Sequence, residues 1–188
     1  MKYWTVQTKE VLDIINRDGV YNPKNTESRY VKENPSLLPL YNFFTMAYNN
    51  VNGTNAEGLI YTFFDCDYNN IHYFMNIDEF TASIKYPIHA NAVRSLWKKL
   101  ISQKDAIIME LEFSDELNPL WIDINDFQFL MPPILCVPPY TEEIFSQICD
   151  FIAEGICFRS PFPSYLIQGH LPYIRKDNIV NIYPVFEI

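Results

Sequence analysis

The chain has 188 residues, of which 48% are hydrophobic and 20% are charged, and its formal net charge is -9. This length suits a single domain, and the composition excludes the charge-rich, apolar-poor class of chains that stay unfolded. The acidic balance and the scattered basic residues disfavour broad nucleic-acid binding, because phosphate backbones are bound by clustered Lys and Arg.

No apolar run approaches the roughly 20 residues that a membrane-crossing helix needs, and the opening residues lack the apolar core of a signal peptide. We therefore expect a cytoplasmic protein that does not contact a membrane. The four cysteines include no Cys-x-x-Cys pair and have apolar neighbours, which predicts reduced thiols that behave as small hydrophobic residues. They are Cys66, Cys136, Cys149 and Cys157.

The chain opens with a predicted strand and helix. Residues 3–7 are aromatic and β-branched, as strands are, and residues 8–19 carry apolar side chains at helical spacing. Thr8 can cap this helix, and Gly19 can end it in the left-handed conformation. Residues 20–36 are polar and contain two prolines, which predicts a long loop that could act as a lid.

The middle of the chain alternates between helices and a hairpin. A helix is predicted over residues 40–47, with Gly53 following its end. Residues 59–65 and 71–77 are aromatic-rich runs separated by turn-forming residues, which predicts a β-hairpin. After them, the apolar spacing predicts a short helix, a break at Pro87 and a longer helix that ends near Lys99.

In the second half, residues 106–113 alternate between apolar side chains on one face and Glu110 and Glu112 on the other. This period of two predicts a strand with one buried face. Residues 120–130 predict a strand or a bent pair of strands, followed by a Pro-rich connector and a helix that runs from Thr141 to Gly155. The last predicted strands cover 165–168 and 179–186, with a turn at 171–174 between them.

This order of elements favours an α+β fold over a parallel doubly wound sheet. We expect one domain over residues 1–188, with a mixed or antiparallel sheet and about three or four helices. None of the five glycines is spaced as in a phosphate-binding loop, which excludes classical dinucleotide folds and P-loop enzymes. The chain also lacks the Gly-x-Ser-x-Gly and His-Glu-x-x-His motifs of common hydrolases and zinc proteases.

Two pairs of carboxylates are candidates for chemistry. Asp65 and Asp67 could hold a divalent ion near His72, but aspartates that cap a turn explain the same pattern, and we expect no metal. Glu110 and Glu112 could divide acid and base roles as paired catalytic carboxylates. A solvated strand face is the ordinary explanation for that second pair. The three histidines lack metal-ligand spacing and are expected to be isolated, hydrogen-bonded side chains.

Three stretches of the chain together resemble a known family. They are residues 3–7 with the following helix and Gly19, residues 109–116 leading into 125–127, and residues 167–168 with 177–180. They are similar to the bacterial family catalogued as domain of unknown function 3841, which has no known activity. Such proteins tend to carry a Trp-His pair where this chain has Leu130 and Met131.

The layout also resembles that of ADP-ribosyltransferase-like domains. These begin with a strand that bears a polar anchor, continue into a helix that ends in glycine, and finish with strands around an Ile/Leu-Pro turn, which here is Leu171-Pro172. The resemblance implies an NAD-dependent enzyme with NAD in a cleft and its nicotinamide against an aromatic ring. The residues that it assigns to cofactor binding are Thr5, Gln7, Tyr21 and Gln168.

ADP-ribosyl transfer also needs an acid that stabilises the positively charged sugar. Gln168 or Ser164 occupies the region where the family's acid would lie, and Glu110 or Glu112 could substitute for it. The proposal requires the opening and closing strands to lie side by side, so that Gln7 and Gln168 line one hollow.

Two alternatives stay open. The chain could be a non-catalytic interaction module whose long loop and aromatic surface bind a protein partner. It could also be a metal-dependent hydrolase that uses Asp65, Asp67 and His72. The small molecule or protein partner is unknown from the sequence.

Overall fold

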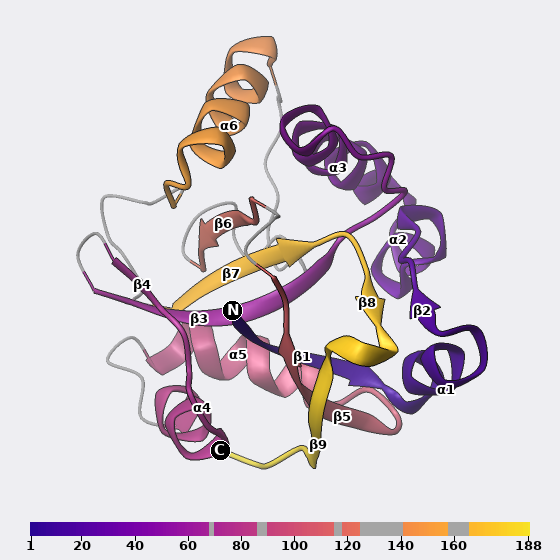
Figure 1. The fold of residues 1–188 in the computed structure, drawn as a ribbon, viewed down its shortest axis with the longest axis vertical. Coiled ribbons are helices and arrows are strands. Elements are labelled where there is room, and N and C mark those ends of the chain that lie inside the picture. The colour runs from indigo at the N-terminus through magenta and orange to yellow at the C-terminus, as the bar shows by residue number, and fades with distance from the viewer. Residues whose placement is uncertain (68–69, 86–89, 115–117, 125–140, 158–165) are drawn as a thin grey trace.

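The computed structural model describes residues 1–67, 70–85, 90–114, 118–124, 141–157 and 166–188 (Figure 1). The helices are α1 (Lys9–Asp18), α2 (Arg29–Glu33), α3 (Leu38–Asn52), α4 (Ile77–Lys85), α5 (Ala90–Ile101) and α6 (Glu142–Glu154). The strands are β1 (Lys2–Thr8), β2 (Val20–Tyr21), β3 (Ile60–Asp67), β4 (Asn70–His72), β5 (Ala106–Glu112), β6 (Leu120–Asp123), β7 (Leu166–Leu171), β8 (Ile174–Arg175) and β9 (Ile179–Pro184).

One antiparallel sheet of seven strands organises the molecule. Its order is β6-β7-β3-β1-β5-β9, with β4 paired to β3, and β2 and β8 form a separate two-stranded sheet. The predicted α+β fold and antiparallel sheet are confirmed. The described residues contain six α-helices and not three or four, in part because the predicted loop over 20–36 holds the short helix α2.

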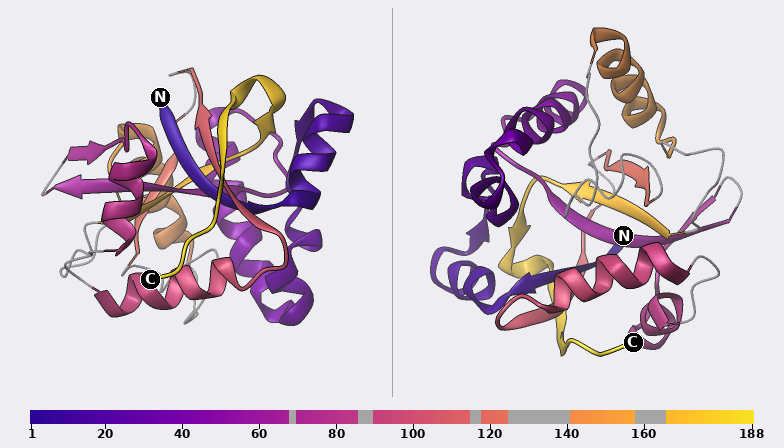
Figure 2. Two further views of the ribbon diagram at one scale, coloured as in Figure 1. Left: turned by 90° about the horizontal axis from the view of Figure 1, so that it is seen from below. Right: turned by 180° about the vertical axis from the view of Figure 1, so that it is seen from behind.

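Both faces of the sheet are covered. On one face, Trp4 and Phe63 belong to a core that also takes buried side chains from α3, α4, α5 and α6. Figure 2 shows α5 lying across this face. On the other face, Tyr3 and Phe64 belong to a second core that is covered by α1 and β8. No helix in the described part of the chain is both long and apolar enough to cross a membrane.

The helix ends follow local sequence signals. Gly19, Gly53 and Gly155 each have a positive φ, from 62° to 79°, and close α1, α3 and α6 in the left-handed conformation that glycine adopts most readily. Thr141 caps α6 by accepting a hydrogen bond from the backbone N–H of Ile144 at 3.3 Å. Thr8 precedes α1 with extended backbone, but its side chain makes no capping bond.

Several predicted bounds differ from the structure. The second hairpin strand stops at His72 instead of residue 77, and the strand predicted over 120–130 ends at Asp123 as β6. Pro87, the Pro-rich connector, residues 125–127, Leu130, Met131 and Ser164 lie outside the described residues.

The prediction that β5 buries one face only is wrong. Ile108 and Glu110 lie on the face expected to be solvated, and they are 0% and 3% exposed. The strand lies between β1 and β9, and the α-helical layer covers that face as well. Glu112, at the end of β5, is exposed.

Candidate functional site

The sheet opens between β1 and β3. Strand β1 pairs with β5 along its whole length, whereas within the described residues its backbone pairs with β3 only where Trp4 lies opposite Phe63. Beyond that point a side chain replaces the ladder, because the buried Thr5 hydroxyl donates to the Tyr61 carbonyl at 2.8 Å. The two strands therefore separate toward the end of β1.

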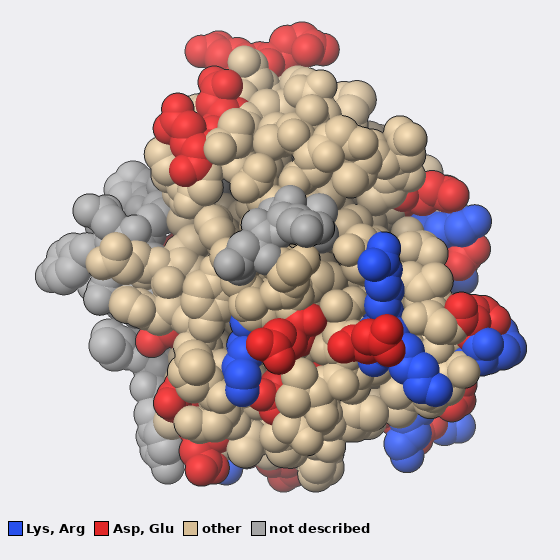
Figure 3. All heavy atoms as spheres, in the orientation of Figure 1, with Lys and Arg blue, Asp and Glu red and all other residues tan. Residues whose placement is uncertain are grey.

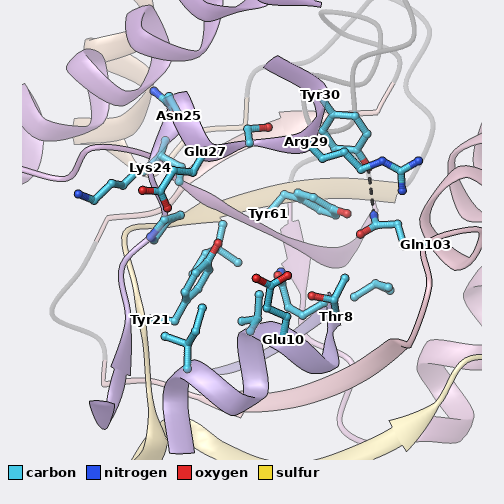
Figure 4. Close-up of a pocket in the computed structure, with 18 of the residues that line it drawn as sticks. Thr8, Glu10, Tyr21, Lys24, Asn25, Glu27, Arg29, Tyr30, Tyr61 and Gln103 are labelled. Atoms are coloured by element: carbon cyan, nitrogen blue, oxygen red, sulfur yellow. Dashed lines mark hydrogen bonds between the residues drawn. The ribbon is translucent and has the colours of Figure 1, made fainter. Parts of the chain in front are cut away.

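A pocket of about 460 Å³ occupies this opening (Figure 4). This volume lies within the range of small-molecule sites. Its walls come from the end of β1, the start of α1, β2, the segment from residue 23 to α2, the start of β3 and the residues after α5. The lining includes Gln7, Thr8, Glu10, Tyr21, Lys24, Asn25, Glu27, Arg29, Tyr30, Lys32, Tyr41, Tyr61, Gln103 and Lys104.

Tyrosine rings form much of the lining. Figure 4 shows Tyr61 across the middle of the pocket, Tyr21 on the side of α1, and Tyr30 at the end near Gln103. Burial raises the pKa of Tyr30 to about 12 and that of Tyr61 well above its ordinary value. These phenols are therefore neutral in ordinary buffers, and each ring offers an apolar face together with a hydroxyl group.

The amide of Gln7 is held in one orientation. Its Nε2 donates to Thr5 Oγ1 at 2.8 Å, and the Thr5 hydroxyl in turn donates to the Tyr61 carbonyl. The side-chain carbonyl oxygen of Gln7 makes no hydrogen bond to any described residue. Gln7 can therefore accept a hydrogen bond from a ligand in the pocket without losing the bond that positions it.

Other polar side chains of the lining have partners already. Asn25 is buried and donates to Asn42 Oδ1 and to Thr45 Oγ1, both at 3.0 Å. Gln103 Nε2 donates to the Tyr30 hydroxyl at 3.2 Å (Figure 4). These bonds fix the walls of the pocket before any ligand is bound.

Charges of both signs surround the pocket. Burial raises the pKa of the Tyr21 hydroxyl, and the nearby carboxylates of Glu27 and Glu10 raise it further, so both acids lie close to this phenol. Lys32 and Lys104 have no ion-pair partner among the described residues. Two other basic residues are paired at the rim, with 2.7 Å between Arg29 Nε and Glu33 Oε1 and 3.5 Å between Lys24 Nζ and Glu57 Oε2.

Three of the four predicted cofactor-binding residues meet at this site. Gln7 and Tyr21 line the pocket, and Thr5 positions Gln7. The fourth, Gln168, does not. Gln168 pairs with Phe63 on β3, and Phe63 pairs with Trp4 on β1. The side chain of Gln168 therefore lies on the same face of the sheet as Trp4.

Gln7 stands three residues after Trp4 and therefore points to the other face of the sheet. Gln168 is also buried, at 1% exposed. The expectation that the opening and closing strands lie side by side is wrong, because β3 separates β1 from β7 and β5 separates β1 from β9.

The predicted catalytic carboxylates lie elsewhere. Glu110 is buried and accepts hydrogen bonds from Lys2 at 2.7 Å, Asn181 at 2.8 Å and Tyr183 at 3.1 Å. Burial acts to raise the pKa of Glu110, but these three bonds outweigh it and hold the pKa below its ordinary value. Neither Glu110 nor Glu112 lines the pocket, so both lie on β5 outside the candidate site.

The metal-site alternative gains no support from the geometry. Asp65 and His72 are opposite each other on β3 and β4, while the side chain of Asp67 lies outside the described residues. Where the structure places the side chains, no three His, Cys, Asp or Glu residues are grouped so as to hold a metal ion.

Sequence reasoning missed most of the pocket. Glu10 was one of several acids in the predicted first helix, and Tyr61 was one aromatic residue among many in a strand. The one available signal is the length of the segment over 20–36, which predicts a functional loop and which supplies nine lining residues between Tyr21 and Lys32.

Comparison of the chain with protein-family models, with curated proteins and with solved structures finds no match. The resemblances to the domain 3841 family and to ADP-ribosyltransferases therefore remain predictions from the sequence.

Proposed function

We propose that the pocket between β1 and β3 binds NAD and that the protein is an ADP-ribosyltransferase-like enzyme. The observation that carries the proposal is the meeting of Gln7 and Tyr21, both predicted to bind NAD, with Tyr61 and Glu10 around one cavity. The proposed catalytic acid differs from the predicted one, because Glu10 lines the pocket and Glu110 does not.

The middle of the pocket suits the nicotinamide ring. Tyr21 and Tyr61 offer aromatic faces for a planar ring. The free carbonyl oxygen of Gln7 matches the N–H donors of the nicotinamide carboxamide, and a site that hydrogen-bonds such a group discriminates against a ligand that lacks it.

The basic side chains suit the pyrophosphate. Lys32 and Lys104 are uncommitted, and Arg29 is bonded through its Nε to one oxygen of Glu33, so its terminal nitrogens can still donate to a phosphate. In a chain of net charge -9, these cations provide local attraction for a phosphate.

We assign the action on the ribose to Glu10, which lines the pocket. In the proposed reaction the bond between the ribose C1′ and the nicotinamide nitrogen breaks, and its electron pair leaves with nicotinamide. The sugar develops positive charge, which a nearby carboxylate stabilises. An acceptor oxygen or nitrogen then bonds to C1′, and its proton passes to Glu10 as general base.

The binding half of the proposal is tested by thermal unfolding with added NAD. A ligand that binds only the folded protein raises the melting temperature with its concentration. We expect such a rise, and we expect Gln7→Met to weaken NAD binding about fivefold, since one hydrogen bond contributes on the order of 1 kcal/mol. ADP-ribose, which lacks the carboxamide, should bind both forms equally. Absence of any rise at millimolar NAD would reject the site.

The catalytic half is tested by release of nicotinamide from NAD, with water or a protein extract as acceptor. Glu10→Gln should lower the rate by roughly a hundredfold while NAD still raises the melting temperature. Glu112→Gln is the matched control, because it removes an exposed acid outside the pocket and should leave the rate unchanged. Equal rates for the two variants would remove Glu10 from the mechanism.

A further inference from the structure

The two ends of the pocket carry opposite charges. Glu10 and Glu27 are the acids of its described lining, and after burial their carboxylates are what raises the pKa of Tyr21, so both lie at the Tyr21 end. Most basic residues of the lining lie at the opposite end, around Tyr30 and Gln103 (Figure 4). They are Arg29 and Lys32, on the helix that holds Tyr30, and Lys104, which follows Gln103.

The positive charge at the Tyr30 end is only partly compensated. Lys32 and Lys104 have no ion-pair partner among the described residues, and Lys99 places its Nζ 4.9 Å from the centroid of the Tyr30 ring. On the face shown in Figure 3, Lys and Arg side chains lie mostly on the side of α1, α2 and β8, among acidic ones. By contrast, α6 carries four acidic and no basic residues. An anionic group is therefore attracted to the Tyr30 end of the pocket.

Two phenols at this end have a hydrogen left to donate. The Tyr30 oxygen accepts from Gln103 Nε2 at 3.2 Å, and this bond leaves the hydrogen of the Tyr30 hydroxyl unused. The hydroxyls of Tyr30 and Tyr61 interact with each other, and that contact uses only one of the two phenol hydrogens. The described residues provide no acceptor for the other. Tyr61 is only 8% exposed, so this donor is held in place by the surrounding structure.

We propose that the Tyr30 end is a phosphate-binding subsite, in which the Tyr30–Tyr61 pair donates its remaining O–H to a phosphate oxygen. The lysines around it balance the charge of the phosphate, and the phenol pair fixes its position. A phosphate suits these donors better than a carboxylate does, because it offers more acceptor oxygens and more negative charge. The inference deepens the proposed function and rests on it for the choice of a diphosphate, since NAD carries that group next to its riboses.

Calorimetric titration with inorganic diphosphate tests the subsite without NAD. We expect one diphosphate to bind per chain, with an affinity that falls as salt is added. Replacing both phenols, by Tyr30→Phe together with Tyr61→Phe, keeps the rings and removes the donors, and should weaken binding about tenfold. Tyr173→Phe is the matched control. Tyr173 is half-buried like Tyr30 and has the guanidinium carbon of Arg175 4.6 Å from its ring centroid, but it lies outside the pocket.

Lys104→Gln provides a second variant that leaves the core untouched, because the side chain of Lys104 is exposed. It should weaken diphosphate binding several-fold and make the affinity less sensitive to salt, since one cation of the subsite is lost. Lys176→Gln, which changes an exposed lysine outside the pocket, should do neither.

Failure of the subsite and failure of the proposed function give different results. Diphosphate binding that depends on the phenols, without any binding of NAD, would support the subsite and reject NAD as the ligand. Binding of NAD without binding of millimolar diphosphate would overturn the subsite alone. A folded double phenylalanine variant that binds diphosphate as tightly as the wild type would overturn it too.

Discussion

His170 carries a titratable group into the core of the molecule. It is 0% exposed on β7, and its Nδ1 lies 2.9 Å from the carbonyl oxygen of Leu120. A carbonyl can only accept, so the hydrogen is on Nδ1. Among the described residues Nε2 has no partner. Burial lowers the pKa of His170 to about 4, against the small opposing effect of the Leu120 carbonyl.

This burial makes stability depend on pH. An unfolded histidine binds a proton near its ordinary pKa of about 6.5, whereas the folded form resists protonation until pH falls to about 4. The free energy of unfolding should therefore decrease as pH falls from 6.5 toward 4, by about 3 kcal/mol in all. His170→Asn, which keeps a donor for the Leu120 carbonyl, should be less stable at pH 7 but should lose this slope.

Urea unfolding followed by circular dichroism between pH 4.5 and pH 7.5 measures the effect. The lower bound keeps Glu110 out of the comparison, because its pKa lies below the ordinary value and its contribution to stability is lost only at lower pH. An identical pH slope in the variant and the wild type would show that His170 is not the group responsible.

Glu110 shows why a residue's environment is difficult to predict from its own strand. The alternation around it was predicted correctly, but the conclusion that its face meets solvent was wrong. Its partners Asn181 and Tyr183 are 71 and 73 residues away in the sequence. They reach it only because β9 pairs with β5, which no local pattern indicates.

At the scale of elements, the two threonines that precede α1 and α6 form a natural comparison. Both have extended backbone, but only Thr141 accepts a hydrogen bond from its helix. Thr141→Ala should lower the free energy of unfolding by about 1 kcal/mol, and Thr8→Ala should cost less because no capping bond is lost. Chemical unfolding of both variants measures the difference, and a larger loss for Thr8→Ala would contradict the assignment of the caps.

Element ends were predictable because their causes are local. Gly19, Gly53 and Gly155 each mark the end of a helix in the sequence and in the structure. The neighbours of a strand have no such local cause. The first and last strands were expected to be adjacent, yet β3 and β5 flank β1, and this difference is what separates Gln168 from Gln7.

At the scale of the whole molecule, one sheet serves both cores, so neither face should unfold alone. Gly169→Ala tests this, because the added Cβ would lie 2.3 Å from Phe64 Cε2 in one core. We expect a loss of about 1–3 kcal/mol. Tryptophan fluorescence, which reports Trp4 and Trp97 in the other core and Trp121 beside Phe64, and circular dichroism should give the same shifted midpoint. Separate midpoints would indicate two cooperative units.

The fold class could be predicted because it depends on the types and order of the elements. The candidate site could be predicted only in part. Thr5, Gln7 and Tyr21 were assigned through a resemblance, whereas Tyr61 and Glu10 join them because two strands separate in space. That separation depends on tertiary geometry, which the pattern of residues within either strand does not predict.

The opening between β1 and β3 divides the sheet into two strips. One strip holds β6, β7, β3 and β4, and the other holds β1, β5 and β9. Near the pocket, the hydrogen bond from the Thr5 hydroxyl to the Tyr61 carbonyl connects the two strips. A ligand bound in the pocket would contact residues of both strips, so its binding should restrict the movement of one strip relative to the other.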